Sequence, residues 1–489
     1  MRARRDAKPT ARPRRSAVRS GILTGVSALV LSGSGAIAAA ILAQKFGRDA
    51  ATDGFLAGYG VYIVLTLVAQ ALRLTAVPEL TRTDGAAAGS FAAAVLAVGV
   101  PASVLTWLVA EPFAEALTGG LPDRAAELAA EALPWLVPAA FAQVLAALGA
   151  ATLAARDRYE AAALGFSGGG LLTLGLFLAL ADEHGLVSLA WGLLAGASFA
   201  LAVSLVALAG RMRLEVRAVG RRLALVFEAA AVPIALQVVY VICLRLAAAL
   251  EVGAVTSFSY AYFFAAILVA ATATSLSVVS TAELTRRGID ARDAAAHVVH
   301  GAWLSLAVIA PAAGVFALAG DRIASSVLGD AFSGEVGAEL ARLVVVLAPW
   351  TLASVGFSLA FPLLYVVERH RVLVPIALGA VALHVPVALA LREALGIEGL
   401  AVALGITALG VLAALLFALS PRALADAAFA LARVAVAVGL IVAASFGLAA
   451  LVLSDAFAAL AGLAVYGALL ALLRPRGLRE AWTYLRELH

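Results

Sequence analysis

The chain has 489 residues, of which 63% are hydrophobic and only 13% are charged. Soluble domains carry about 25% charged residues, and apolar runs of about 20 residues recur along this chain, so the composition excludes a soluble globular protein. The net charge of +4 comes from arginines in short loops between apolar runs, which is typical of membrane topology and not of nucleic-acid binding.

Residues 1–20 form a polar, arginine-rich arm that we expect to be disordered on the cytoplasmic face of the membrane. The apolar run that follows, from Gly21 to Gln44, is longer than the hydrophobic region of a signal peptide. Because further apolar runs follow at once, we expect the arm to remain attached and to fix the direction of the first span.

About 14 apolar segments are long enough to cross a membrane, which predicts an all-α polytopic membrane protein. The predicted spans are residues 21–44, 54–78, 91–110, 132–154, 161–181, 188–210, 224–249, 255–280, 299–319, 338–364, 372–391, 398–420, 427–453 and 456–473. If the N-terminus is cytoplasmic, arginines such as Arg156 and Arg158 fall in cytoplasmic loops, and acids such as Glu111 and Glu115 fall in the opposite loops. The even count then predicts that both termini are cytoplasmic.

Two segments, Ala51–Arg82 and Val255–Arg286, align with each other without a gap. Thr52 matches Thr256, and both segments end in the tetrad Glu-Leu-Thr-Arg. Such internal similarity is typical of transporters built from two repeats around a central site. With roughly six spans in each half, both repeats begin on the same side of the membrane, so we expect parallel repeats. The predicted domains are a basic arm (1–20), an N-terminal half (21–210), a basic linker (211–223), a C-terminal half (224–420), two additional helices (421–473) and a cytoplasmic tail (474–489).

The motif FGxxAATDxFxxxY at Phe46–Tyr59, followed by VPxL at Val77–Leu80, resembles the start of proteins of the MurJ/MviN family. These are the lipid II flippases of the multidrug/oligosaccharidyl-lipid/polysaccharide exporter superfamily. The plan of two six-span halves and two additional helices is also similar. The resemblance implies a transporter in the bacterial cytoplasmic membrane that flips a lipid-linked cell-wall or polysaccharide precursor by alternating access.

The chain departs from this family at the arginines that face the central cavity. The stretches that match the family's charged segments are uncharged here: Leu31–Ile37 in the first span, Ile63–Leu65 in the second and Tyr260–Phe264 in the eighth. The resemblance therefore implies the fold more strongly than it implies lipid II as the substrate.

Polar residues within the spans are the candidates for substrate binding. Arg245 leads, because an arginine in an apolar span is costly unless it faces a cavity or a partner, and its guanidinium can hold a pyrophosphate through two parallel bonds. The alternative is an anchor at the outer interface, and Arg73 allows the same two interpretations at the inner interface. The other candidates either line the cavity or bond helices together. They are Gln70, Gln237, Tyr260, Thr274 and Ser277.

Two further polar residues lie within apolar spans. His384 could relay protons or be structural, and Cys243, the single cysteine, is predicted to be a small buried residue. The sequence shows no catalytic triad, phosphate-binding loop or metal-ligand spacing, so we expect neither an enzyme nor a cofactor or metal.

Three functions fit these features. A lipid-linked glycan flippase would have the glycan precursor and membrane lipids as partners. A cation-coupled drug exporter would need an acidic residue in the first or seventh span, where the chain offers only Glu228 at the inner edge. A flippase-derived scaffold that no longer transports would use the basic arm to dock cell-wall synthesis proteins.

Overall fold

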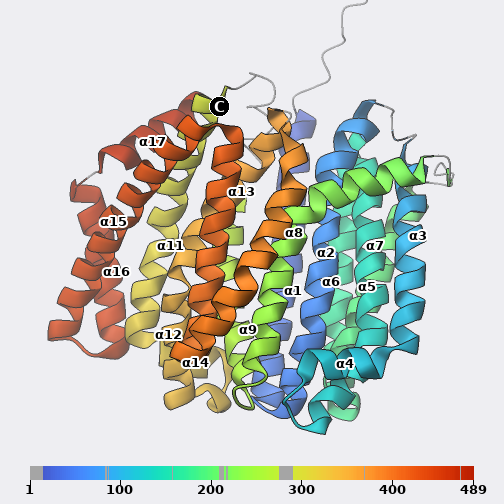
Figure 1. The fold of residues 1–489 in the computed structure, drawn as a ribbon, viewed down its shortest axis with the longest axis horizontal. Coiled ribbons are helices and arrows are strands. Elements are labelled where there is room, and N and C mark those ends of the chain that lie inside the picture. Colours follow the sequence, from blue (N-terminus) through green and yellow to red (C-terminus); the bar gives the residue numbers. More distant parts are fainter. Residues whose placement is uncertain are drawn as a thin grey trace, which may run out of the picture.

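The computed structural model describes residues 15–488 except 83–84, 86, 157, 209–213, 216–217, 275–289, 368 and 474. The helices are α1 (Arg15–Phe46), α2 (Ala50–Arg82), α3 (Ala88–Leu108), α4 (Ala110–Thr118), α5 (Asp123–Ala155), α6 (Tyr159–His184), α7 (Val187–Leu208), α8 (Val219–Ala247), α9 (Ala254–Val269), η1 (Ala270–Thr274), α11 (Ala291–Leu328), η2 (Asp330–Phe332), α12 (Glu335–Val346), α13 (Ala348–Val366), η3 (His370–Val372), α14 (Leu373–Leu419), α15 (Pro421–Val452), α16 (Asp455–Leu473) and α17 (Arg476–Leu488). In Figure 1 the long helices run side by side, with α17 at one end and α4 at the other. We call these the α17 end and the α4 end.

The structure confirms an all-α polytopic membrane protein. Ten helices of the described residues are long and apolar enough to cross a membrane, or eleven if the bent pair α12–α13 counts as one span. The number 14 is therefore not confirmed and stays a prediction. Gly396 divides the long helix α14 into two arms, because its φ of 61° lies in a region that glycine adopts readily.

Two predicted spans differ in detail from the helices. The predicted span 338–364 consists of α12 and α13, which meet at an angle of 44°. Pro349 lies in the first turn of α13 and has no N–H to continue the ladder of α12, which accounts for the break. The predicted span 255–280 begins as α9, and the chain continues through the π-helical turn η1 before it leaves the described residues.

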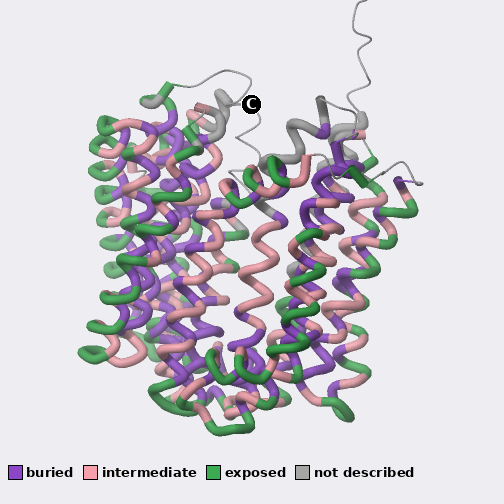
Figure 2. Tube along the Cα trace, turned by 45° about the vertical axis from the view of Figure 1, so that its right-hand side comes forward, coloured by how far each residue is buried: buried purple, intermediate pink, exposed green. Residues whose placement is uncertain are grey.

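The helices pack in two groups. Helices α1, α5, α6 and α7 pack on one another, and α11, α12, α13 and α14 form the other group. In Figure 2 the buried residues gather in two groups of helices, with residues of intermediate exposure running between them. Helix α2 packs on both α5 and α8, and α8 packs on α14 to a similar extent as on α2, so α2 and α8 bring the two groups together. The residue limits of the two predicted halves stay a prediction.

Helices α15 and α16 extend the second group, because α15 packs on α11 and α16 packs on α15. The start of α15 is set locally: Pro421 occupies the first turn, and the Ser420 hydroxyl accepts a hydrogen bond from the N–H of Ala423 at 2.8 Å. Helix α17 crosses the end of α11, where Ala481 is fully buried.

Candidate functional site

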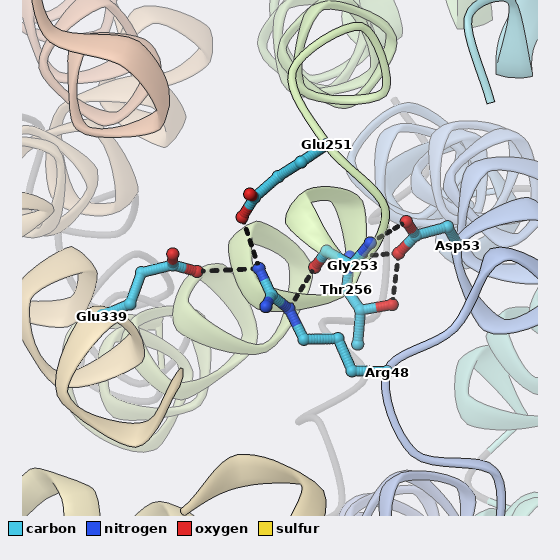
Figure 3. A network of polar contacts seen from close by, with 6 residues as sticks. All are labelled: Arg48, Asp53, Glu251, Gly253, Thr256 and Glu339. Carbon is cyan, nitrogen blue, oxygen red and sulfur yellow. Dashed lines mark hydrogen bonds and ion pairs between the residues drawn. The ribbon is translucent and has the colours of Figure 1, made fainter. Parts of the chain in front are cut away.

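The first turns of α2 and α9, which are the equivalent starts of the two sequence repeats, meet at the α4 end. The carboxylate of Asp53 on α2 is fully buried there. It accepts hydrogen bonds from the N–H of Gly253 at 2.5 Å, from the N–H of Thr256 at 2.9 Å and from the hydroxyl of Thr256 at 2.5 Å (Figure 3). The first N–H groups of a helix lack partners within it and carry partial positive charge. Asp53 therefore caps α9 from a helix of the other repeat.

Arg48, in the connection between α1 and α2, extends this contact to two more segments. Its Nε donates to the carbonyl of Gly253 at 2.9 Å, and its Nη2 lies 3.0 Å from Glu251 and 3.2 Å from Glu339 of α12 (Figure 3). The side chains of Arg48 and Glu339 are only 15% and 20% exposed, so their ion pair is largely shielded from water, whereas Glu251 is 62% exposed. We call Arg48, Asp53, Glu251, Gly253, Thr256 and Glu339 the closing network.

The position of Gly253 in this network requires glycine. Its φ is 92°, and a Cβ built on it would lie 2.4 Å from Cγ and Nε of Arg48. The arginine side chain can therefore lie across the turn only because residue 253 has no side chain.

Aromatic rings continue the contact between α2 and α9 further along both helices. Phe55 and Tyr59 on α2 stack at 6.1 Å, and Tyr59 meets Phe263 on α9 edge to face at 6.2 Å. The Tyr260 hydroxyl donates to the carbonyl of Ala39 on α1 at 3.0 Å. The polar closing network and this aromatic layer together join the two groups of helices at the α4 end.

Beyond the aromatic layer, α2 has a uniform environment for two turns. All residues from Val61 to Val68 are of intermediate exposure, whereas a helix at the surface of a bundle alternates between buried and exposed positions. Tyr62 lines a small cavity of about 80 Å³ with Ser34 and Gln143, among α1, α2, α5, α6 and α7. This part of α2 therefore borders accessible space within the membrane-spanning body.

A second, larger cavity of about 330 Å³ lies among α9, α11, α12, α13 and α15. Its lining includes Leu268, Ile309, Val344 and Val438, and it reaches Gly439 on the exposed face of α15. Because nearly all of its lining is aliphatic, this cavity suits a hydrocarbon chain and not a charged head group.

Four of the seven predicted substrate-binding residues cannot be placed. The side chains of Gln70, Arg73 and Thr274 lie outside the described part of the structure, and so does Ser277 altogether. Their predicted role therefore stays a prediction.

The other three predicted residues lie at different depths. Gln237 in the middle of α8 donates to the Tyr262 hydroxyl at 2.8 Å, and its Oε1 is buried without a partner among the described residues. Tyr260 belongs to the contact with α1. Arg245 lies in the last turn of α8, where its Nε donates to the carbonyl of Ala116 near the C-terminus of α4 at 2.7 Å. Arg245 thus binds the negative end of a helix at the α4 end.

We expect Arg245→Ala to lower the thermal unfolding midpoint, because it removes a charge-assisted hydrogen bond worth about 1.5 kcal/mol from the end of α4. Arg245→Lys keeps the positive charge and should recover part of the loss. Thermal unfolding of the purified protein in detergent measures both. Unchanged unfolding together with lost transport would instead support the predicted role of Arg245 in head-group binding.

The sequence reasoning did not single out the closing network. Two of its members carried a signal, since Asp53 belongs to the AATD motif and Thr256 is the repeat partner of Thr52. Glu251 lies in the connection between α8 and α9, and Glu339 lies in the second turn of α12. No sequence pattern distinguished either residue, so their approach to Arg48 emerges only from the packing of distant helices.

Comparison with known proteins gives a consistent result. The model of the lipid II flippase MurJ family matches residues 42–471. No curated protein matches the chain by sequence. Among solved structures, a lipid II flippase MurJ in an inward closed conformation is similar with a TM-score of 0.72 and 15% identity, over 93% of this chain and 98% of that one. A multidrug resistance MATE family transporter of the MOP superfamily, in an inward-facing conformation, has a TM-score of 0.62 and 13% identity, over 85% and 98%. A eukaryotic MATE transporter has a TM-score of 0.58 and 14% identity, over 86% and 99%.

Proposed function

Because this chain belongs to the MurJ lipid II flippase family, we propose that it flips a lipid-linked cell-wall or polysaccharide precursor, similar to lipid II, across the bacterial cytoplasmic membrane by alternating access. The observation that carries the alternating-access part is the closing network. It joins the two repeats at one end through bonds that can break without unfolding either group of helices.

In the proposed cycle, the α4 end faces the outside and is closed in this structure. The head group enters between the two groups of helices from the α17 end, next to the part of α2 that borders accessible space. Breaking the closing network then lets the groups separate at the α4 end and releases the head group outward. The polyprenyl chain stays in hydrocarbon throughout, and the 330 Å³ apolar cavity that reaches the exposed face of α15 supports a place for part of it.

A flipping assay with defined lipids tests this function. Purified protein in liposomes that contain a fluorescent undecaprenyl-pyrophosphate glycan should expose the inner-leaflet glycan to an external quencher, and empty liposomes should not. A cationic dye in the same liposomes separates this function from drug export. Export of the dye without movement of the glycan would overturn the proposal, and movement of neither would favour the scaffold.

We expect Gly439→Phe to slow flipping by roughly tenfold. A Cβ at Gly439 meets nothing within 4 Å, so the ring can enter the apolar cavity without displacing the protein. Excluding two methylene groups of a lipid chain costs about 1.6 kcal/mol, which corresponds to roughly a tenfold loss of affinity. The rate in the liposome assay is the measurement.

The matched control is Gly447→Phe on the same helix. Gly447 also has open space around it but lies away from the cavity lining, so this ring should project from the protein and leave the rate unchanged. Equal flipping rates for the two variants would show that the lipid chain does not occupy this cavity.

A further inference from the structure

An open cavity of about 650 Å³ lies near the α4 end of the second group of helices, among α11, α12, α14 and α16. Figure 1 draws these helices on the side of the molecule away from α3. The cavity shares no lining residue with the 330 Å³ apolar cavity, and the proposed flipping cycle does not use it. We call it the α16 cavity.

The lining of the α16 cavity changes from apolar to charged in the direction of the α4 end. On α11, Phe316 and Leu318 line its inner part, and Asp321 lies closer to the α4 end, where α11 finishes. On α12, which begins at the α4 end, Val345 lies deeper than Arg342. An apolar interior and a charged mouth follow each other in the same order as the acyl chains and the head group of a phospholipid in the leaflet at that end.

Exposed apolar side chains place this mouth at the depth of the lipid head groups. Asp455 lines the mouth at the start of α16. Leu451 and Val452 at the end of α15 are both 82% exposed, and Phe457 and Leu460 on α16 are 69% and 65% exposed. Apolar side chains on the outside of a membrane-spanning bundle face hydrocarbon, so the hydrocarbon region extends to within about one turn of Asp455.

The mouth carries charges of both signs. Arg342 pairs with Glu398 on α14 at 3.1 Å, and Arg322, beside the cavity, pairs with Asp455 at 2.5 Å. Asp321 is exposed and lines the cavity, and its carboxylate forms no ion pair or hydrogen bond with another described residue. The three carboxylates therefore outnumber the two guanidinium groups, and the surplus negative charge lies at Asp321.

This arrangement selects among possible ligands by their charges. Arg342 bonds Glu398 through Nε, which leaves its terminal N–H groups for a phosphate, and Asp321 can accept hydrogen bonds from a primary ammonium group. A quaternary ammonium has no N–H to donate, and an anionic head group offers Asp321 no positive charge. In the described part of the chain, no three acidic, histidine or cysteine side chains approach closely enough to hold a metal ion, so a divalent cation does not fit.

We propose that the α16 cavity binds a phospholipid with a primary ammonium head group, such as phosphatidylethanolamine, from the leaflet at the α4 end. The ammonium group donates to Asp321, the phosphate accepts from Arg342, and the first part of an acyl chain lies against Phe316 and Val345. The site lies outside the contact between α2 and α9, so this lipid is a bound ligand of the protein and not the flipped precursor.

Native mass spectrometry of the purified protein in detergent tests the site with three lipids that have identical acyl chains. The protein should bind phosphatidylethanolamine roughly tenfold more tightly than phosphatidylcholine or phosphatidylglycerol, because only the first donates hydrogen bonds from an ammonium group to a carboxylate. Asp321→Asn should abolish this preference. Asp330→Asn changes an exposed acid at the same end that does not line the cavity, and it should keep the preference.

Asp321→Lys gives a sharper test, because it leaves the mouth with one more positive than negative charge. The order of affinities should then invert, with phosphatidylglycerol bound more tightly than phosphatidylethanolamine. Equal binding of the three lipids by the unmodified protein, or an order that Asp321→Lys leaves unchanged, overturns the proposal.

A second pair of variants tests whether the lipid enters the cavity. Ala317 is an exposed residue of the lining, so the indole of Ala317→Trp can fill the cavity without changing any charge, and phosphatidylethanolamine binding should be lost. Val308→Trp places the same ring on an exposed position of α11 outside the lining and should bind the lipid normally. Normal binding by Ala317→Trp overturns the proposal. These measurements contain no glycan, so their failure leaves the proposed flipping intact, and a protein that flips no glycan can still show this lipid preference.

Discussion

Asp53→Asn is expected to open the α4 end and to shift the conformational equilibrium by at least roughly tenfold. The carboxylate accepts three hydrogen bonds through its two oxygens and faces the positive end of α9. An asparagine amide has a single acceptor oxygen, so its NH2 group must face at least one of these N–H donors. Breaking one partner of a buried, charged hydrogen-bond set costs about 2–5 kcal/mol, and 1.4 kcal/mol is a factor of ten in population.

Spin labels on cysteines introduced at Asp123 and Ser333, two exposed residues at the α4 end, measure this opening as a longer label-to-label distance. The flipping rate should also fall, because the closed state becomes rare. Asp182→Asn is the matched control. Asp182 lies at the same end and pairs with Lys45, but it is 83% exposed and both residues belong to the first group of helices. Exposed pairs contribute about 0–1 kcal/mol, so the control should leave the distance unchanged. An equal effect of both changes would mean that Asp53 does not close this end.

Gly253→Ala is expected to weaken the closing network nearly as much as Asp53→Asn does. Alanine at a positive φ costs about 1–2 kcal/mol, and the new Cβ displaces Arg48, which then loses its bonds to the Gly253 carbonyl and to the two glutamates. We expect longer distances across the α4 end and a lower unfolding midpoint.

Gly120→Ala separates backbone strain from the displacement of Arg48. Gly120 also has a positive φ, of 104°, and lies beside α4, but the nearest atom to its added Cβ is at an ordinary 3.4 Å. The Gly120→Ala control should lower the unfolding temperature through backbone strain, without changing the distance across the α4 end. A longer distance in Gly120→Ala would mean that strain at this end is sufficient to open it.

The parts of this architecture that follow from local pattern could be predicted from sequence. Apolar length and loop charge predicted an all-α membrane protein, and α15 and α16 separate close to Asp455, where the prediction divided them. The alignment of Thr52 with Thr256 pointed to the pair of helices that meet at the closing network. Aligned positions in two copies of one sequence segment occupy equivalent places in the fold, so the alignment of the repeats identifies both helices at once.

The parts that depend on packing between distant segments could not be predicted. Arg245 and Ala116 are 129 residues apart, and Cys243 and His384 are 141 apart, so no local pattern links them. The sequence offered both a functional and a structural interpretation of Arg245 and His384. Only the identity of the facing atoms, a helix carbonyl in one case and a thiol, a hydroxyl and a backbone carbonyl in the other, gives each residue its chemistry.

Helices α2 and α9 are capped in different ways, so only one of them keeps its N-terminal cap when the α4 end opens. Helix α2 carries its own cap, because Asp49 accepts a hydrogen bond from the N–H of Thr52 at 2.7 Å, whereas α9 depends on Asp53 from the opposite repeat. Separation therefore leaves the start of α2 intact and deprives α9 of its acceptor, so that water must solvate its first N–H groups. The two repeats therefore differ in local stability when the α4 end opens. Amide hydrogen exchange should be faster in the first turn of α9 than in the first turn of α2.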